Sequence, residues 1–206
     1  MENYPKEIDF QDILKRQYRI GELYIEGKKR KLWQFPILPA QDKGIEILQT
    51  IVKNAPYAEI SPKAQFNIAT TYKKMGKYTE AIDAYQKVIT NYKDSPWYEE
   101  SLYQIGWCNY KKSHGFSYDQ LAAKESVKYF QQFAQEFPQS KHTPKINEML
   151  NQLLERQAKG ILEIARFYDA HHHTQAAIMY YKEIIDKFPD TIEAKQAEKR
   201  LKVLEK

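Results

Sequence analysis

A spacing of small and apolar residues recurs four times along the chain and restricts the folds that it can adopt. Each copy begins with a small residue, and an apolar or aromatic residue follows after four positions and another after three more. The end of a helix is marked five positions later. The copies begin at Gly44, Ala81, Ser126 and Ala177. Because steps of four and three return to one face of an α-helix, the chain is predicted to be a helical repeat protein.

A second predicted helix precedes each copy and has its own small residue, at Gly21, Ala69, Gly106 and Ala165. Small residues on both helices let antiparallel neighbours approach closely, and this pairing is typical of tetratricopeptide repeats of about 34 residues. We therefore predict an all-α tetratricopeptide-repeat (TPR) solenoid with about four helix-turn-helix repeats and a C-terminal capping helix. It would form a single domain over residues 1–206, with repeats at about 9–57, 61–94, 96–139 and 143–190 and the capping helix at 191–206.

The join between the third and fourth repeats is longer than the others. Pro138 and Ala165 are 27 positions apart, whereas the equivalent distance from Pro56 to Ala69 is 13, so 27 − 13 = 14 residues are added. These residues amount to about four helical turns and predict one long first helix in the fourth repeat. Hydroxyl residues that precede a proline are further expected to cap helices at Ser61, Ser95 and Thr143.

The bulk composition and the motifs argue against several classes of function. Net charge is 32 − 27 = +5 with mixed signs, which does not indicate nucleic-acid binding. The single cysteine, Cys108, permits no internal disulfide. No phosphate-binding loop or catalytic motif is found, and the triple histidine 171–173 is interpreted as a turn instead of a metal site. The chain is therefore predicted to have no enzymatic activity, cofactor or metal, and, as given, to be soluble without a targeting segment.

The first helix of each repeat would line a groove that binds peptides. Positions five, nine and twelve share one face of that helix, and the same register applied to the first three repeats gives a groove rich in aromatic residues. Aromatic anchors carry much of the energy of protein interfaces, so an extended peptide with aromatic side chains and a terminal carboxylate would suit it. The alternative is that these rings pack on neighbouring helices. The predicted groove residues are Tyr18, Phe66, Lys73, Tyr103, Trp107 and Tyr110.

The insert in the first repeat, "KKRKLWQFPILPA", has three interpretations. One is an extended polyproline II segment held by Pro36 and Pro39. Its basic residues 28–31 precede Trp33 and Phe35, a combination that can lie at an anionic membrane surface. A solvated loop whose aromatic residues pack back onto the first repeat is the favoured interpretation. The role of residues 28–39 stays open at this point.

The join "FPQSKHTPKINEMLNQLLERQAKGILEIARFYDAHHHTQAAIMYYKEIIDKFPDT" resembles the BamD (YfiO/ComL) family of outer-membrane assembly lipoproteins, which similarly have an insert in the third repeat and a long helix entering the fourth. Leu153, Arg156, Ala158 and Phe167-Tyr168 match that helix. The resemblance implies a scaffold on the periplasmic face of the outer membrane, held by a lipid anchor that this sequence lacks. Its N-terminal repeats would bind unfolded β-barrel substrates, and the long helix near Arg156 and Arg166 would lie toward a BamA-like component.

Two other binding roles compete with the scaffold role. A periplasmic TPR adaptor that coordinates peptidoglycan and outer-membrane machinery is the main alternative, although such adaptors usually carry an N-terminal coiled coil that is not visible here. A cytosolic co-chaperone would need a carboxylate clamp of lysine and asparagine in the groove. Asn67 fits that clamp, but Glu22 stands where a second asparagine is required.

Overall fold

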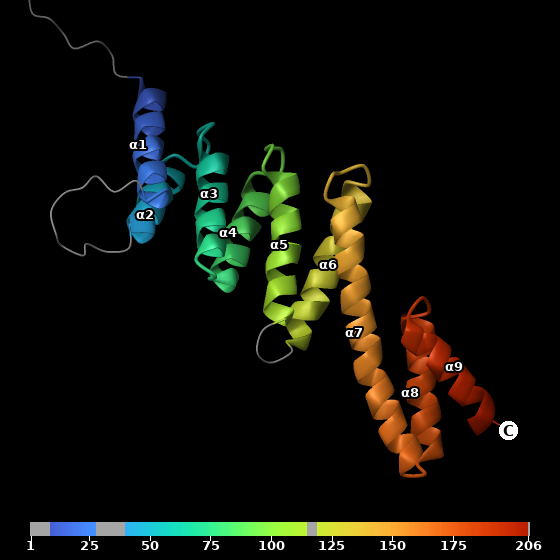
Figure 1. The fold of residues 1–206 in the computed structure, drawn as a ribbon. Coiled ribbons are helices and arrows are strands. Elements are labelled where there is room, and N and C mark those ends of the chain that lie inside the picture. The colour runs from blue at the N-terminus through green and yellow to red at the C-terminus, as the bar shows by residue number, and fades with distance from the viewer. Residues whose placement is uncertain (1–8, 28–39, 115–118, 206) are drawn as a thin grey trace, which may run out of the picture. The chain divides into compact units, whose positions relative to one another are not determined.

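A computed structural model describes residues 9–27, 40–114 and 119–205 of the chain. Within these residues the regular elements are α-helices that pair as hairpins (Figure 1). The all-α repeat fold predicted from the spacing is confirmed. The basic insert at 28–39 lies outside the described residues. The pairs are α1 (Phe10–Ile25) with α2 (Ala40–Asn54), α3 (Ser61–Lys74) with α4 (Tyr78–Asn91), α5 (Tyr98–Ser113) with α6 (Gln120–Glu136), and α7 (Thr143–Ala170) with α8 (Thr174–Lys187), followed by α9 (Ile192–Leu204).

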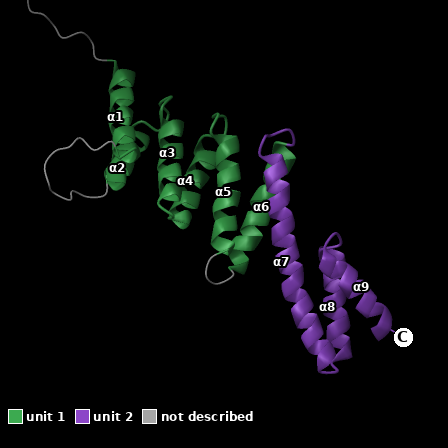
Figure 2. Ribbon diagram, viewed as in Figure 1, with its two compact units in different colours: residues 1–137 green, residues 138–206 purple. Residues whose placement is uncertain are grey.

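The chain divides into two compact units, residues 1–137 and 138–206 (Figure 2). In the first unit, α2 packs against α3 and α4 packs against α5, so that three hairpins stack in sequence order. In the second unit, α9 packs on α8 and α7. A single domain over the whole chain stays a prediction, because each unit has its own internal packing.

The recurring apolar positions form the interior of the hairpins. These side chains come from the second helix of each pair and are exposed by no more than 2% of their surface. Full burial of such a side chain stabilises a fold by roughly 1.5–3 kcal/mol relative to leaving it in water. The residues are Leu48, Ile51, Tyr85, Val88, Phe130, Phe133, Tyr181 and Ile184.

Small residues permit close helix contacts at the predicted places. A Cβ atom on Gly44 would lie 2.8 Å from the carbonyl oxygen of Gly21, so α1 and α2 could not pack at their present distance with a larger residue there. A Cβ on Gly106 would lie 2.6 Å from the ring of Phe130. Ser126 is fully buried, and its hydroxyl donates a 2.9 Å hydrogen bond to the carbonyl oxygen of Gly106. The small residues thus set the distance between paired helices.

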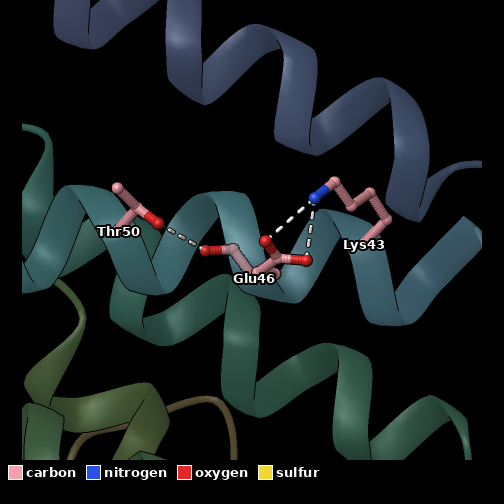
Figure 3. A network of polar contacts seen from close by, with 3 residues as sticks. All are labelled: Lys43, Glu46 and Thr50. Atoms are coloured by element: carbon pink, nitrogen blue, oxygen red, sulfur yellow. Dashed lines mark hydrogen bonds and ion pairs between the residues drawn. The ribbon is translucent and has the colours of Figure 1, made fainter.

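The outer face of α2 is polar and makes local contacts (Figure 3). Lys43 Nζ lies 2.9 and 2.8 Å from the two carboxylate oxygens of Glu46, and the Thr50 hydroxyl donates to the Glu46 carbonyl oxygen at 2.9 Å. An exposed pair of this kind contributes only a few tenths of a kcal/mol, about 0.3–0.5. The face therefore keeps the helix soluble, while the opposite face supplies the packing energy.

The long helix has the predicted length. α7 has 28 residues and α3, a regular first helix, has 14, a difference of 28 − 14 = 14 residues. The predicted capping role of the hydroxyl residues is wrong. Ser61 and Thr143 are the first residues of their helices and cap neither one, and the Ser61 hydroxyl donates instead to the Ala55 carbonyl oxygen. Ser95 lies before α5, which begins at Tyr98, and its hydroxyl oxygen is buried without a hydrogen-bond partner.

Candidate peptide-binding surface

Lys73 of α3 and Trp107 of α5, two of the predicted groove residues, lie close together. The ammonium nitrogen of Lys73 is 5.1 Å from the centre of the Trp107 ring and donates to Gln104 Oε1 at 2.9 Å. A second ammonium group, from Lys111, lies 5.5 Å from the same ring, and the Tyr78 ring approaches it edge-on at 5.9 Å. We name Lys73, Gln104, Trp107 and Lys111 the α3–α5 cluster.

The α3–α5 cluster has the kinds of side chain that bind an aromatic ring and a carboxylate. Trp107 is half-buried, so that part of its ring remains available to a ligand. Each lysine over the ring is held by a cation–π attraction of about 0.5–1 kcal/mol, which restrains the ammonium group without neutralising it. An indole ring beside two positive charges can therefore receive an aromatic side chain and an anionic group together.

Phe66 of α3 belongs to a separate aromatic group. Its ring centre is 4.7 Å from that of Trp97 and 5.5 Å from that of Tyr85, which it meets edge-on. The Tyr85 hydroxyl lies 3.0 Å from the Thr70 hydroxyl oxygen. Since Phe66 is half-buried, it shares its surface between this packing and solvent.

The three predicted groove tyrosines differ in how far they are available to a ligand. Tyr103 is 6% exposed, and its ring packs on Phe130 and Phe133 of α6. Tyr18 is 4% exposed, and its hydroxyl bonds to Glu22 and accepts from Asn67. Tyr110 is half-buried and lies against the His114 ring at 4.2 Å.

Burial changes the acidity of the groups around this surface. Burial raises the pKa of the Tyr18 hydroxyl, and the nearby Glu22 carboxylate raises it further. Burial also raises the pKa of the Cys108 thiol to about 12, although Lys73 and Lys112 act in the opposite direction. Both groups are therefore neutral near pH 7, so the charges at the α3–α5 cluster come from Lys73 and Lys111 and from Glu100, whose carboxylate accepts a 2.6 Å hydrogen bond from Gln104 Nε2.

Sequence reasoning missed several residues that contact the predicted ones, among them Gln104, Lys111 and Trp97. Gln104 and Lys111 lie three positions before and four after Trp107, a spacing that places them on its helix face and that could have identified them. Trp97 immediately precedes α5, and the groove positions counted along the first helix of each repeat do not include it.

The predicted docking arginines both lie on α7 in the second unit, and both are exposed. They are ten residues apart, or about 15 Å along the helix. Arg166 donates to Gln196 Oε1 of α9 at 2.7 Å. Nearby, Arg200 of α9 holds Asp169 with two hydrogen bonds of 2.6 and 2.9 Å, and these bonds lower the pKa of the Asp169 carboxyl.

Two surface hollows adjoin the α7–α8 turn of the second unit, one beside Tyr168 and His173 and the other beside Arg166 and Arg200.

Among the described residues, no group of three or more His, Cys, Asp or Glu side chains is placed to hold a metal ion. In that part of the chain, no helix combines the length and the apolar character that a membrane span requires.

Comparison with known proteins gives two results. A family model described as "YfiO: Outer membrane lipoprotein" matches residues 39–206. The curated protein "Outer membrane protein assembly factor BamD" of Caulobacter vibrioides is 20% identical over 160 residues. The alignment covers 78% of this chain and 52% of the relative, so the chain spans about half the length of the curated protein that it matches.

Proposed function

Because the chain belongs to the YfiO family of outer-membrane lipoproteins, we propose that it is a non-enzymatic scaffold for the insertion and folding of β-barrel proteins in the outer membrane. It would act at the periplasmic face of that membrane and be held there by a lipid anchor outside the given sequence. Its partners would be unfolded β-barrel substrates and a BamA-like component, and it would bind no nucleic acid.

The observation that carries the substrate part of this proposal is the α3–α5 cluster. Many β-barrel proteins end in an aromatic residue with a free carboxylate. Trp107 would receive the terminal aromatic ring, and Lys73 with Lys111 would receive the carboxylate. A charge-assisted hydrogen bond of this kind contributes about 1.5–3 kcal/mol when water is excluded. Phe66 would contact a side chain further from the peptide terminus.

The second unit would dock onto the BamA-like component. Arg156 and Arg166 are both exposed on α7, and the Asp169–Arg200 pair fixes α9 beside Arg166. Acidic groups on the partner would pair with these arginines. Substitution of either arginine by glutamate is expected to weaken the complex with purified BamA-like periplasmic domains without changing helix content.

A binding experiment with labelled peptides tests the substrate part. A peptide from the last strand of a β-barrel protein, ending in phenylalanine and a free carboxylate, is titrated with the full chain while fluorescence anisotropy is recorded. We expect micromolar binding. Lys73→Ala and Trp107→Ala should each weaken it at least several-fold, and the same peptide with an amidated terminus should bind more weakly to the unaltered chain.

Two controls make this experiment decisive. Lys74→Ala removes an exposed lysine from the next position of α3 and should leave the affinity unchanged. Far-UV circular dichroism should show the same helix content in every variant. If the peptide does not bind, or if Lys73→Ala and Lys74→Ala behave alike, the cluster is not a substrate site. The role as a periplasmic adaptor would then be preferred.

A further inference from the structure

The turn between α7 and α8 contains a residue in an uncommon backbone conformation. His172 has a φ of 61°, in the left-handed region. The equivalent residue of the α3–α4 turn is Gly76, with a φ of 74°, since each lies seven positions after the small residue of the preceding helix. Glycine adopts this conformation without strain, whereas a Cβ atom makes it unfavourable. Strained residues cluster at binding sites, so the side chains around His172 are candidates for one.

His172 borders a surface hollow of about 460 Å³ between α7 and α9, which we name the α7–α9 hollow. This volume falls within the usual range of small-ligand sites, roughly 300–1,000 Å³. Its polar lining comes from Arg166 and Asp169 of α7, His172 of the turn, Thr174 of α8 and Arg200 of α9. All of these residues belong to the second unit, so the shape of the hollow does not depend on where the first unit lies.

Asp169 holds Arg200 in a fixed orientation at the wall of the α7–α9 hollow. Asp169 Oδ2 accepts from Arg200 Nε at 2.6 Å and from the Tyr181 hydroxyl at 3.1 Å, and Asp169 Oδ1 accepts from Arg200 Nη2 at 2.9 Å. Both carboxylate oxygens are thus engaged. The Asp169 side chain is 13% exposed and that of Arg200 is 46% exposed, so the guanidinium group is the more accessible partner. Arg200 uses two of its five N–H groups in this pair, and the others can serve a ligand.

Arg166 adds a second guanidinium group beside the first. Its Nη2 donates to Gln196 Oε1 of α9 at 2.7 Å, and Gln196 lies one helical turn before Arg200. Asp169 is ionised near pH 7, because its hydrogen bonds from Arg200 and Tyr181 lower the pKa of its carboxyl. The two arginines and the aspartate therefore carry one excess positive charge. That excess matches the single negative charge of a carboxylate better than the larger charge of a phosphate group.

The α7–α9 hollow lies on the helix face that carries the α3–α5 cluster in the first unit. Asp169 lies four residues after the small residue of α7, as Lys73 lies four residues after that of α3. Arg166 likewise holds the position of Thr70. In helical repeat proteins this face forms the concave binding surface, so ligand binding is the expected use of both places.

From these observations we propose that the α7–α9 hollow binds a carboxylate group through Arg166, Arg200 and a ring N–H of His172. The guanidinium groups donate to the carboxylate oxygens, and the imidazole, which has a ring N–H in either protonation state, donates a further hydrogen bond. An acidic side chain of a protein and a small free acid offer the same chemistry. The site shares Arg166 with the docking surface proposed above, but carboxylate binding is measured without any partner, so either proposal can fail alone.

Nuclear magnetic resonance of the ¹⁵N-labelled full chain tests the proposal, with the arginine Nε–H signals as the readout. The probes are acetate, inorganic phosphate, an acetylated and amidated Gly-Glu-Gly peptide, and the same peptide with glutamine in place of glutamate. We expect the glutamate peptide and acetate to shift the signals of Arg166 and Arg200 with millimolar affinity, and the glutamine peptide to leave them in place. Tighter binding of the glutamate peptide than of acetate would identify a protein side chain as the source, and equal affinities a small acid.

Two substitutions separate binding from folding. Arg166→Gln and His172→Gly should each weaken binding of the glutamate peptide at least several-fold. His172→Gly should at the same time raise the urea midpoint of the second unit, because glycine relieves the left-handed backbone. That midpoint is read from the circular dichroism transition that tryptophan fluorescence does not follow. A higher midpoint without loss of affinity would overturn the role of His172.

Lys199→Gln is the matched control for Arg166→Gln, because Lys199 is an exposed positive charge next to Arg200 that does not line the hollow. It should leave the affinity unchanged, and all variants should keep the same helix content. The proposal would be overturned if neither arginine signal shifts, if the glutamine peptide binds as well as the glutamate peptide, or if phosphate binds more tightly than both carboxylates. Equal losses of affinity in Arg166→Gln and Lys199→Gln would also overturn it.

Discussion

The different surroundings of Gly106 in α5 and Gly160 in α7 predict opposite effects for the same glycine-to-alanine substitution. In Gly106→Ala, the new Cβ would lie 2.6 Å from two carbons of the Phe130 ring. Carbon atoms normally pack at about 3.5–4.0 Å, so the ring would have to withdraw by about 1 Å. Phe130 is fully buried, and Tyr103 packs beside it, so it cannot swing into solvent. Overpacking of this kind costs about 1–3 kcal/mol.

The helix propensity of alanine offsets part of that cost by about 1 kcal/mol. We therefore expect Gly106→Ala to lower the free energy of unfolding of the first unit by up to about 2 kcal/mol. Gly160→Ala, in the middle of α7, meets nothing within 4 Å and should stabilise the second unit by about 1 kcal/mol. The two substitutions are chemically identical, so only their surroundings can separate them.

Urea denaturation can follow the two units separately. The three tryptophans of the sequence, Trp33, Trp97 and Trp107, all belong to the first unit, so their fluorescence reports its unfolding. Circular dichroism at 222 nm reports both units. If Gly106→Ala stabilises the first unit by about 1 kcal/mol, as expected of Gly160→Ala in the second, the close contact between α5 and α6 is not rigid, and the account of small residues as spacers is wrong.

Three further predictions follow from buried or paired groups. Hydrogen bonds from Arg200 and Tyr181 lower the pKa of the Asp169 carboxyl. The Asp169–Arg200 pair therefore contributes stability that is present above the ordinary carboxyl pKa of about 4 and is lost as pH falls through the lowered value. Asp169→Asn should destabilise the second unit at pH 7 and have less effect at pH 3, as measured by urea denaturation. The Cys108 thiol, with its pKa raised to about 12, should resist a thiol-reactive dye at pH 8 until urea unfolds the first unit. Tyr103→Ala should lower the free energy of unfolding by about 3–5 kcal/mol, as other large-to-small aromatic core substitutions do, and a smaller loss would favour a surface role for that ring.

The hairpins could be predicted from the sequence because helical repeats leave a periodic record. A small residue such as Gly44 lies where the two helices of a hairpin approach closely, and an apolar residue such as Leu48 follows on the same face. Counting between such positions also gave the length of α7. These features depend on the spacing of residues within and between helices, which can be counted directly in the sequence.

The candidate site could be predicted only in part, because residue spacing assigns a side chain to one face of its helix but does not show which other segments pack on that face. Tyr103 and Phe66 hold the same position in successive repeats, yet Tyr103 is buried against α6 and Phe66 is half-buried against Trp97. The sequence shows neither the rotation of α6 nor the course of the link that carries Trp97. For the same reason, Ser95 resembles a helix cap in the sequence but lies three residues before the start of α5.

The most direct test of the proposed scaffold role is to deplete the chain from the organism that produces it and to measure how much β-barrel protein reaches the outer membrane in folded form. Folded barrels migrate differently from unfolded ones when samples are not heated before electrophoresis, so the two forms can be quantified on one gel. The account predicts that depletion lowers the folded fraction of several barrel proteins, that the unaltered chain restores it, and that the Lys73→Ala, Trp107→Ala double variant restores it poorly. Normal levels of folded barrels after depletion would contradict the account.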